Sequence, residues 1–215
     1  MRFEVAGLLF DLYGTLVNSH SAVDRAWTAY ARRHSLNPAD VLQRIHGRRA
    51  LDTIRLLTPN IDADQEYEIV RRDERTDLKD VTPLPGAKEI LRNVDPTLWA
   101  IVTSGTSDVA HARIKHCGLP EPKHVVYGEE IERGKPEPDE FLAGAQKLGL
   151  RPEQCLVFED TEPGVQAAKA AGMNVIGIAA ASGREGLKCA DAIVNDFTAI
   201  AVTRRKSTLL VIAWP

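Results

Sequence analysis

The 215-residue sequence predicts an α/β fold built on a Rossmann-like parallel sheet. Short, unbroken apolar runs alternate along most of the chain with stretches of helical periodicity, as in strands joined by crossover helices. A strand that is covered on both faces has no polar alternation, because neither face meets water. The runs that fit this description are residues 5–10, 98–103, 125–127, 155–158 and 175–178, with a weaker sixth at 192–194.

Four helical stretches lie between these runs, at about residues 86–94, 106–117, 139–148 and 162–171. A glycine follows three of them at Gly118, Gly149 and Gly172, the position where glycine commonly ends a helix. Pro163 fits the first turn of the last helix. Because crossover connections are right-handed, we expect helices on both faces of the sheet.

One segment, residues 17–83, interrupts the alternation. Its pattern is helical throughout, without a good strand, and we expect helices near residues 23–34, 41–45, 50–57 and 65–79. We therefore predict a helical cap subdomain of residues 17–83, inserted into an α/β core of residues 1–16 and 84–215, with hinges near 16–18 and 81–83. The apolar end of the chain, within residues 208–215, is expected to add or cover an edge strand.

The composition excludes several classes of protein. A net charge of −3 disfavours a protein that coats nucleic acid, and no apolar run approaches the roughly 18 residues of a membrane-spanning helix. The start of the chain does not resemble a signal peptide, and the three cysteines form no C-x-x-C pair. We expect a cytoplasmic protein, a monomer or weak homodimer, with no nucleic-acid or membrane partner.

Polar residues follow successive predicted strands at the point where each strand ends. In open α/β sheets the carboxyl ends of the strands share one edge, where ligands bind. We therefore expect these residues to converge, although each alone is more commonly a helix cap, a turn or a solvated charge. They are Asp11, Ser104 with Gly105, Lys135, and the adjacent pair Glu159 and Asp160.

This set suits chemistry on an anionic substrate. A carboxylate at a strand end can act as a covalent nucleophile or as a magnesium ligand, and Lys135 can keep it ionised while neutralising a phosphate. Ser104 and nearby backbone N–H groups can bind phosphate oxygens. The pair Glu159 and Asp160 can complete the coordination of a hard cation.

Four motifs in this chain resemble those of the haloacid dehalogenase superfamily in order and spacing. They are LFDLYGTLV, IVTSG, GKPEPD and VFEDTEPG, and the last two resemble the phosphatase and phosphomutase branch. The stretches HGRRALDTI and TPLPGAKEIL resemble the group of sugar phosphatases, 2-deoxyglucose-6-phosphatases and glycerol phosphatases. The resemblance covers nearly the whole chain and implies an Mg²⁺-dependent hydrolase that acts on a small phosphorylated sugar or polyol.

The resemblance also implies roles for individual residues. Asp11 would attack phosphorus and form an aspartyl-phosphate, and Lys135 would pair with the phosphate and with Asp11. Ser104 and Gly105 would bind phosphate oxygens. Mg²⁺ would be held by Asp11, the carbonyl of Tyr13 and Asp160, with Glu159 in support. The cap residues that would close over the leaving group of the substrate are His46, Gly47, Arg48 and Arg49.

Position 13 departs from the phosphatase pattern. These phosphatases normally carry Asp there, which protonates the departing alkoxide and then activates water, whereas this chain carries Tyr13. A phenol with a pKa of roughly 10 is a poor base at neutral pH, so we expect the activity to be impaired. Dehalogenases of the superfamily do carry Tyr in a D-x-Y-G-T motif, but they use no metal and lack the acidic pair. The alternatives are therefore a 2-haloacid dehalogenase-like hydrolase and a non-catalytic relative that binds phosphate esters.

Overall fold

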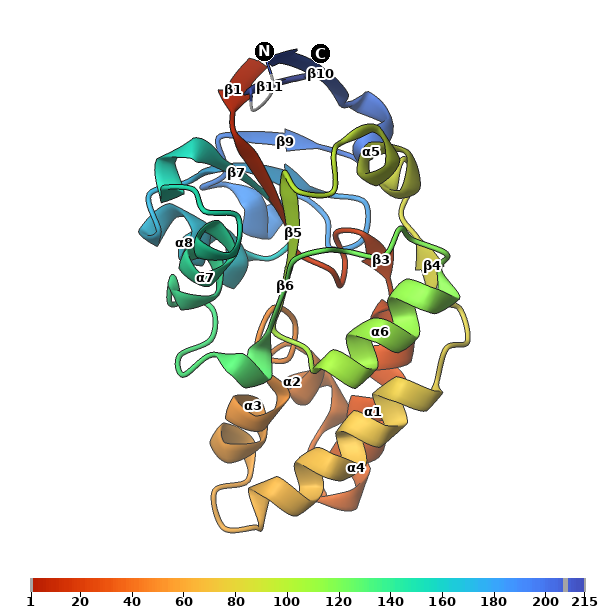
Figure 1. Ribbon diagram of the computed structural model, residues 1–215. Coiled ribbons are helices and arrows are strands. Elements are labelled where there is room, and N and C mark those ends of the chain that lie inside the picture. Colours follow the sequence, from red (N-terminus) through yellow and green to blue (C-terminus); the bar gives the residue numbers. More distant parts are fainter. Residues whose placement is uncertain (1, 207–208, 215) are drawn as a thin grey trace.

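A six-stranded sheet forms the centre of the computed structural model, which describes residues 2–206 and 209–214 (Figure 1). Its strand order is β6-β5-β2-β7-β8-β9, and every neighbouring pair is parallel. The predicted parallel α/β sheet is therefore confirmed. The strands are β2 (Gly7–Phe10), β5 (Trp99–Thr103), β6 (Val125–Tyr127), β7 (Cys155–Glu159), β8 (Asn174–Ile178) and β9 (Ala192–Val194).

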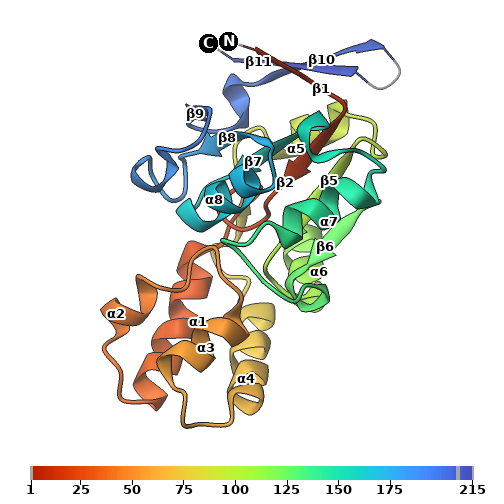
Figure 2. The ribbon, with the colours of Figure 1, turned by 90° about the vertical axis from the view of Figure 1, so that its left-hand side faces the viewer.

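The four predicted crossover helices are also present, and they cover both faces of the sheet (Figure 2). The backbone φ angles of Gly118, Gly149 and Gly172 are +60°, +68° and +78°, so these glycines end three of the helices in the left-handed region as expected. Short 3-10 turns lie at Gly128–Glu130, Pro152–Gln154, Glu185–Leu187 and Phe197–Ala199. The helices are α5 (Ala87–Asn93), α6 (Ser107–His116), α7 (Asp139–Lys147) and α8 (Glu162–Ala170).

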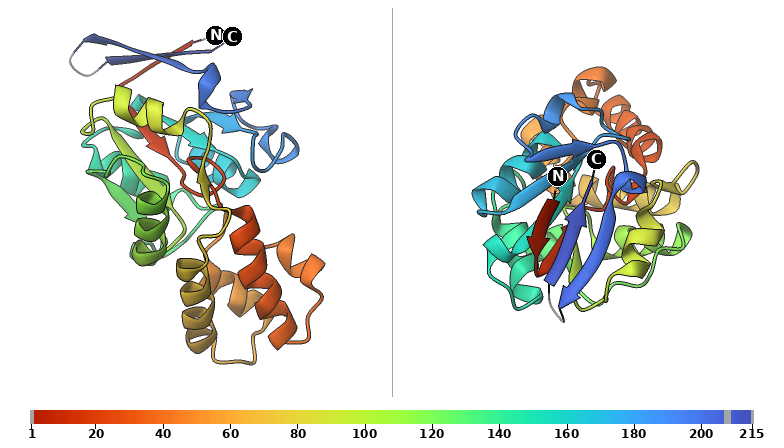
Figure 3. Two further views of the ribbon diagram at one scale, coloured as in Figure 1. Left: turned by 90° about the vertical axis from the view of Figure 1, so that its right-hand side faces the viewer. Right: turned by 90° about the horizontal axis from the view of Figure 1, so that it is seen from above.

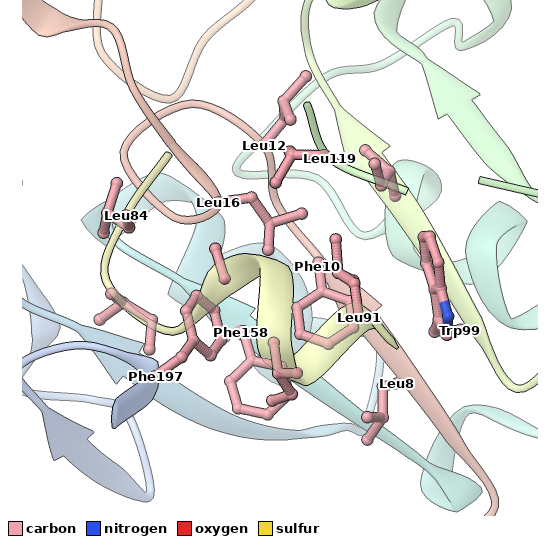
Figure 4. Packing of buried hydrophobic residues seen from close by; sticks show 14 of the residues in the cluster. Leu8, Phe10, Leu12, Leu16, Leu84, Leu91, Trp99, Leu119, Phe158 and Phe197 are labelled. Atoms are coloured by element: carbon pink, nitrogen blue, oxygen red, sulfur yellow. The ribbon is translucent and has the colours of Figure 1, made fainter. Parts of the chain in front are cut away.

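Each face of the sheet has its own apolar cluster. Along β2, Leu8 and Phe10 point to the cluster on the α5 and α6 side, while Leu9 belongs to the cluster under α7 and α8. The Phe10 ring stacks on Phe158 with ring centroids 4.8 Å apart, and Trp99 meets Phe10 edge-on (Figure 4). This packing fixes the carboxyl ends of the central strands relative to one another.

The prediction of one strand over residues 5–10 is wrong. The chain bends at Ala6, whose N–H donates to the Gln154 carbonyl (2.8 Å), and the run splits into β1 (Arg2–Val5) and β2. No sequence pattern indicates the bend, because the residues on both sides of it are apolar and become buried in different sheets.

The end of the chain forms a second sheet together with β1. Strands β10 (Ala201–Lys206) and β11 (Leu209–Ala213) join β1 in the antiparallel order β1-β11-β10. The apolar end is strand-like as expected, but β11 is the middle strand of this separate sheet and not an edge strand. Within the predicted segment 208–215, positions 208 and 215 lie outside the described residues. The two ends of the chain lie side by side, at the end of the molecule away from α1 to α4 (Figure 3).

Four helices between β2 and α5 pack on one another beside the carboxyl edge of the main sheet (Figure 2). They enclose a separate apolar cluster that includes Trp27, Tyr30, Ile54 and Val70. All four expected helices are present, with ends shifted by a few residues. They are α1 (His20–Arg33), α2 (Pro38–Leu42), α3 (Ala50–Leu57) and α4 (Ala63–Thr76).

The two connections between this helical segment and the rest of the chain pair with each other. Strand β3 (Val17–Asn18) runs antiparallel to β4 (Thr82–Pro83), and the Leu84 N–H donates to the Leu16 carbonyl at 2.9 Å. The expectation of no strand within residues 17–83 is therefore wrong at both ends. Two-residue strands carry no apolar periodicity, so sequence patterns do not indicate them.

None of the helices in the described part of the chain is both long and apolar enough to cross a membrane.

Two leucines test the contribution of the core. Leu8→Ala should lower the free energy of unfolding by about 2–5 kcal/mol, because Leu8 is 0% exposed and its loss leaves a cavity between β2 and the helices. Leu56→Ala is the matched control, because Leu56 is 63% exposed and its loss should change stability by no more than about 0.5 kcal/mol. Urea denaturation measures both. Equal losses would contradict this packing.

Candidate active site

The residues that follow the predicted strands meet at the carboxyl edge of the main sheet. Asp11 follows β2, Ser104 follows β5, and Glu159 ends β7 with Asp160 directly after it. Lys135 lies in the connection between β6 and α7. The structure thus brings together side chains that are up to 149 positions apart in the sequence, as the parallel topology requires.

The ammonium of Lys135 is the centre of this cluster. Its Nζ donates to Asp11 Oδ1 at 2.6 Å and to Glu159 Oε1 at 2.7 Å, and it lies 3.9 Å from Glu140 Oε2. All four residues are buried. Charge-assisted hydrogen bonds of this length hold the two strand-end carboxylates in fixed positions.

Glu140 is a member of the cluster that sequence reasoning missed. This fully buried residue in the first turn of α7 accepts a hydrogen bond from Ser104 Oγ at 2.9 Å and so links the β5 loop to Lys135. In the sequence it directly follows GKPEPD, which contains the acids Glu137 and Asp139, and nothing there distinguishes Glu140 from these two.

The cluster holds more negative than positive charge, and the pKa directions reflect this. Burial raises the pKa of Asp11 well above its ordinary value, and the neighbouring Glu159 and Asp160 raise it further, against the opposing effect of Lys135. For Lys135, burial alone would lower the pKa, but the surrounding carboxylates outweigh it and raise the pKa well above the ordinary value. Lys135 is therefore a cation throughout the physiological pH range.

Glu159 fixes the loop that carries Asp160. Its Oε2 accepts hydrogen bonds from the N–H groups of Asp160 (2.6 Å) and Thr161 (2.7 Å) and from Thr161 Oγ1 (3.0 Å). Its other oxygen is bonded to Lys135. Both oxygens of Glu159 thus have protein partners, which suits a residue that positions the loop.

Asp160 lies against the loop that follows Asp11. Thr15 Oγ1 donates to Asp160 Oδ1 at 3.3 Å, and Ser182 Oγ donates to Asp160 Oδ2. The contact also requires glycine at position 14, where φ is +88° and a Cβ would lie 2.0 Å from Asp160 Oδ2. Thr15 and Ser182 were not predicted as site residues.

Three carboxylates of the cluster could hold a divalent cation. One oxygen from each of Asp11, Glu159 and Asp160 lies within 4.8 Å of the others, and all three residues are buried. Asp11 Oδ2 is buried and has no hydrogen-bond partner among the described residues, so it is available as a ligand. Carboxylate oxygens around an excess of negative charge suit a hard cation such as Mg²⁺.

Tyr13 lies beside this cluster with its ring against the loop after β5. A Cβ on Gly105 would come within 2.5 Å of Tyr13 Cε2, so the ring packs directly on the backbone there. Burial raises the pKa of the Tyr13 phenol well above its ordinary value, despite the opposing effect of Arg113. The phenol therefore keeps its proton at neutral pH and can donate a hydrogen bond, but it is a poor base.

A cavity of about 440 Å³ lies between the cluster and the helical segment. The core lines it with Asp11, Tyr13, Ser104 and Gly105, among others. The helical segment contributes all four of its predicted substrate-binding residues, His46, Gly47, Arg48 and Arg49, and also His20 and Trp27, which were not predicted. A concave, mixed polar and apolar site of this size suits a small molecule.

The four predicted residues differ in their contacts. Arg49 contacts the connection between β6 and α7, because its guanidinium donates to the carbonyls of Ile131 and Glu132. The His46 ring lies 4.7 Å from that of His20, and a Cβ on Gly47 would meet Thr161 Oγ1 at 2.4 Å. The Arg48 side chain is exposed and makes no hydrogen bond or ion pair within residues 2–206 and 209–214. Arg48 is therefore the member of this group with a cation available to a ligand.

Known proteins are similar to this chain in sequence and in fold. Residues 5–172 match the family model for haloacid dehalogenase-like hydrolases. The chain is similar to hexitol phosphatase A of Escherichia coli (strain K12), with 44% identity over 204 residues, which cover 93% of this chain and 94% of that protein. It is also similar to glycerol-1-phosphate phosphohydrolase 2 of Saccharomyces cerevisiae, with 32% identity over 223 residues that cover 94% and 86%. A crystal structure of a hydrolase from Pseudomonas syringae superposes with a TM-score of 0.79 at 26% identity, covering 89% of this chain and 94% of that one.

Removal of the central ammonium tests the electrostatics of the cluster. Lys135→Met should lower the free energy of unfolding at neutral pH by about 3–5 kcal/mol, because buried carboxylates are left without their cation. Lys147→Met is the control, since the Lys147 ion pair with Glu130 (2.7 Å) lies at the surface and should contribute no more than about 1 kcal/mol. Denaturant titration of both variants gives the difference. A similar small loss of stability in both variants would show that Lys135 does not stabilise the buried carboxylates.

His46 should make stability depend on pH. Burial first, and then the neighbouring His20, lower the pKa of His46 from its ordinary value of 6.5. As the pH falls through about 6.5, the unfolded chain takes up the proton first, and the folded state loses stability relative to it. His46→Gln should therefore lose less stability than the parent between about pH 7 and pH 5. Thermal melts measure the slope, with His116→Gln, an exposed histidine on α6, as the control for removing an imidazole.

Proposed function

The chain belongs to the haloacid dehalogenase-like hydrolase family, and from this premise we propose that it is an Mg²⁺-dependent phosphatase of small phosphorylated sugars or polyols. As its relatives indicate, it is a hydrolase of phosphate monoesters. The observation that carries the finer proposal is the contact between Lys135 Nζ and Asp11 Oδ1 at 2.6 Å, beneath the 440 Å³ cavity and beside the three-carboxylate cluster.

The reaction begins at Asp11. A carboxylate oxygen of Asp11 attacks phosphorus, the bond from phosphorus to the ester oxygen breaks, and the alkoxide takes up a proton from solvent as it leaves. Water then attacks the aspartyl-phosphate, which returns Asp11 as a free carboxylate and releases inorganic phosphate. Lys135 keeps Asp11 oriented and neutralises charge on the phosphoryl group, and Ser104 with the Gly105 backbone binds phosphoryl oxygens.

The metal proposal rests on the same carboxylates. Asp11, Asp160 and the carbonyl of Tyr13 would hold Mg²⁺, and Glu159 would keep the Asp160 loop in place. When bound, Mg²⁺ would neutralise phosphoryl charge and favour attack at phosphorus. The buried Asp11 Oδ2, which has no hydrogen-bond partner among the described residues, fits this assignment.

We further propose that residues 17–83 act as a cap over a core of residues 1–16 and 84–215. The cap helices supply one wall of the cavity, and the β3–β4 pair joins the two connections at its base. His46, Gly47, Arg48 and Arg49 line the cavity on the cap side. Closure of the cap on bound substrate would exclude water from the first step.

The substrate class is supported by relatives and by the lining of the cavity. The chain is 44% identical to a hexitol phosphatase and 32% identical to a glycerol-1-phosphate phosphohydrolase. Carboxylates, arginines and histidines of the cap can bond the hydroxyl groups of a polyol, and Trp27 offers an apolar surface. These contacts suit a hydroxylated chain that carries one phosphate.

Tyr13 limits this activity in our proposal. The alcohol product needs a proton and the attacking water needs a base, and a phenol of raised pKa supplies the second function poorly. Turnover should therefore be slow, with aspartyl-phosphate accumulating on Asp11. Tyr13 also matches the first motif of dehalogenases, which is the observation that favours 2-haloacid hydrolysis as the second candidate.

Restoring a carboxylate at position 13 tests the proposal. Tyr13→Asp should raise the turnover of a hexitol phosphate by about 10²- to 10⁴-fold, because acid–base assistance returns. The gain with p-nitrophenyl phosphate should be smaller, because nitrophenolate leaves with little protonation. Phosphate release is measured with Mg²⁺ and with EDTA, and mass spectrometry of the intact protein detects phosphorylated Asp11. Asp11→Asn is the inactive control.

Four results would contradict the proposal. Phosphate release unaffected by EDTA would contradict the metal requirement. No phosphate release by either the parent or Tyr13→Asp would contradict the phosphatase activity. Chloride release from 2-chloropropionate, unchanged by EDTA, would favour the dehalogenase candidate. Tight binding of phosphate esters without turnover in either variant would favour a non-catalytic relative.

A further inference from the structure

Arg113 is a buried cation that none of the steps above uses. It lies on α6 in the core, it is 0% exposed, and its Nε has no hydrogen-bond partner among the described residues. An arginine is rarely buried without a carboxylate in close contact, and the Nη2 of Arg113 is 4.0 Å from Glu74 Oε2. The position of this side chain therefore needs a reason other than a close ion pair.

The guanidinium of Arg113 stacks on the ring of Tyr13. Its central carbon lies 4.6 Å from the ring centroid, a distance at which a cation attracts an aromatic face. On the Gly105 side, a Cβ would lie 2.5 Å from Cε2 of the ring and 2.6 Å from its hydroxyl oxygen. The ring of Tyr13 is thus held between Arg113 and the phosphate-binding loop.

The hydroxyl of Tyr13 is left available by this arrangement. Thr103 is a neighbour whose side chain interacts with the Tyr13 hydroxyl, but its Oγ1 accepts from the Gly105 N–H at 3.1 Å. The Tyr13 hydroxyl makes no hydrogen bond of normal geometry among the described residues. Tyr13 lines the cavity together with Asp11 and Ser104. A buried O–H group without a partner is costly, so a ligand oxygen in this cavity would be a favourable acceptor.

We propose that Arg113 is a positioning residue, which holds the Tyr13 ring so that its O–H donates to an oxygen of the bound phosphate ester. This inference rests on the proposed phosphatase function, and it assigns to Tyr13 the role of a fixed hydrogen-bond donor. No proton changes owner in this contact. Its effect is to stabilise negative charge on the ester oxygen as the bond to phosphorus breaks.

The cap holds Arg113 in turn. Nη1 of Arg113 donates to Ser19 Oγ (3.3 Å) and Nη2 donates to the Glu74 carbonyl (3.2 Å). Trp27 Nε1 donates to Glu74 Oε1 at 3.0 Å, so a residue that lines the cavity orients the partner of Arg113. Because Ser19, Trp27 and Glu74 belong to residues 17–83, the Tyr13 hydroxyl is positioned when this segment is docked as observed.

A double-mutant cycle tests the assignment. Tyr13→Phe should lower kcat for a hexitol phosphate about 10-fold, and Arg113→Met should lower it by a similar factor with KM within about two-fold. In the Tyr13→Phe background, Arg113→Met should cause no further loss, because the hydroxyl that it positions is absent. Arg113→Lys should restore part of the loss, since it keeps the charge but not the planar group.

Controls separate positioning from folding. Arg33→Met removes a cap arginine that pairs with Glu66 away from the cavity, and it should leave kcat unchanged. If Arg113→Met does not fold, as judged by circular dichroism, Ser19→Ala is the milder variant. It removes one hydrogen bond of the Arg113 guanidinium. It should lower kcat about two- to three-fold in the parent and not at all in the Tyr13→Phe background.

The outcomes are distinct. If Arg113→Met lowers kcat by the same factor in the parent and in the Tyr13→Phe background, the positioning role is overturned and the phosphatase proposal stays intact. Tyr13→Phe with unchanged kcat would overturn it as well. Absence of turnover in the parent and in Tyr13→Asp would overturn the proposed function and this inference with it.

Discussion

The arrangement of the acidic residues at the sheet edge depends on the buried ammonium of Lys135. Three buried carboxylates, from Asp11, Glu140 and Glu159, lie within 3.9 Å of it, and burial of so many acids without a cation would be strongly unfavourable. The ammonium reaches Asp11 and Glu159 only because β2 and β7 are neighbours in parallel register, with Phe10 paired to Phe158. The stack of these two rings therefore supports the geometry of the site as well as the stability of the core. Packing and electrostatics thus impose one common requirement, that these two strands end at the same level.

Much of the fold could be predicted from the sequence because its signals are local. Unbroken apolar runs marked the six strands of the main sheet, and glycine after a helix identified Gly118, Gly149 and Gly172. The bend at Ala6 could not be predicted, since an apolar run does not reveal that its two halves enter different sheets.

The same limit applies to the site. Topology alone places the residues at the ends of strands at one edge, which is how Asp11, Lys135 and the pair Glu159 and Asp160 could be found. Glu140 and Arg113 act through partners 36 and 39 positions away, Ser104 and Glu74, and no local pattern reports such contacts. Their importance follows from burial, which is a property of the folded chain.

The arginines of the helical segment explain how it docks on the core. Arg71 and Arg75 both approach Asp108 of α6, at 3.8 and 3.7 Å, and Arg49 donates to backbone carbonyls of the core. Partly exposed ion pairs of this kind each contribute little, so the docked arrangement depends on several weak polar contacts and on the buried Arg113. Polar contacts lose less than an apolar seam when they separate into water, which suits the cap movement proposed above.

The two-residue pairing of β3 with β4 has a consequence for the tolerance of the fold to insertions. Since Val17 lies opposite Pro83 and Asn18 opposite Thr82, the core meets the whole inserted helical segment as if it were the tip of one hairpin. The entropy lost in closing such a loop grows only with the logarithm of its length, and a doubling costs roughly 0.6 kcal/mol. The stability of the core therefore depends little on the number of residues in the insertion, provided that the two ends of the insertion lie side by side. Segments of different length and shape can then be exchanged at this junction without rebuilding the sheet beneath it.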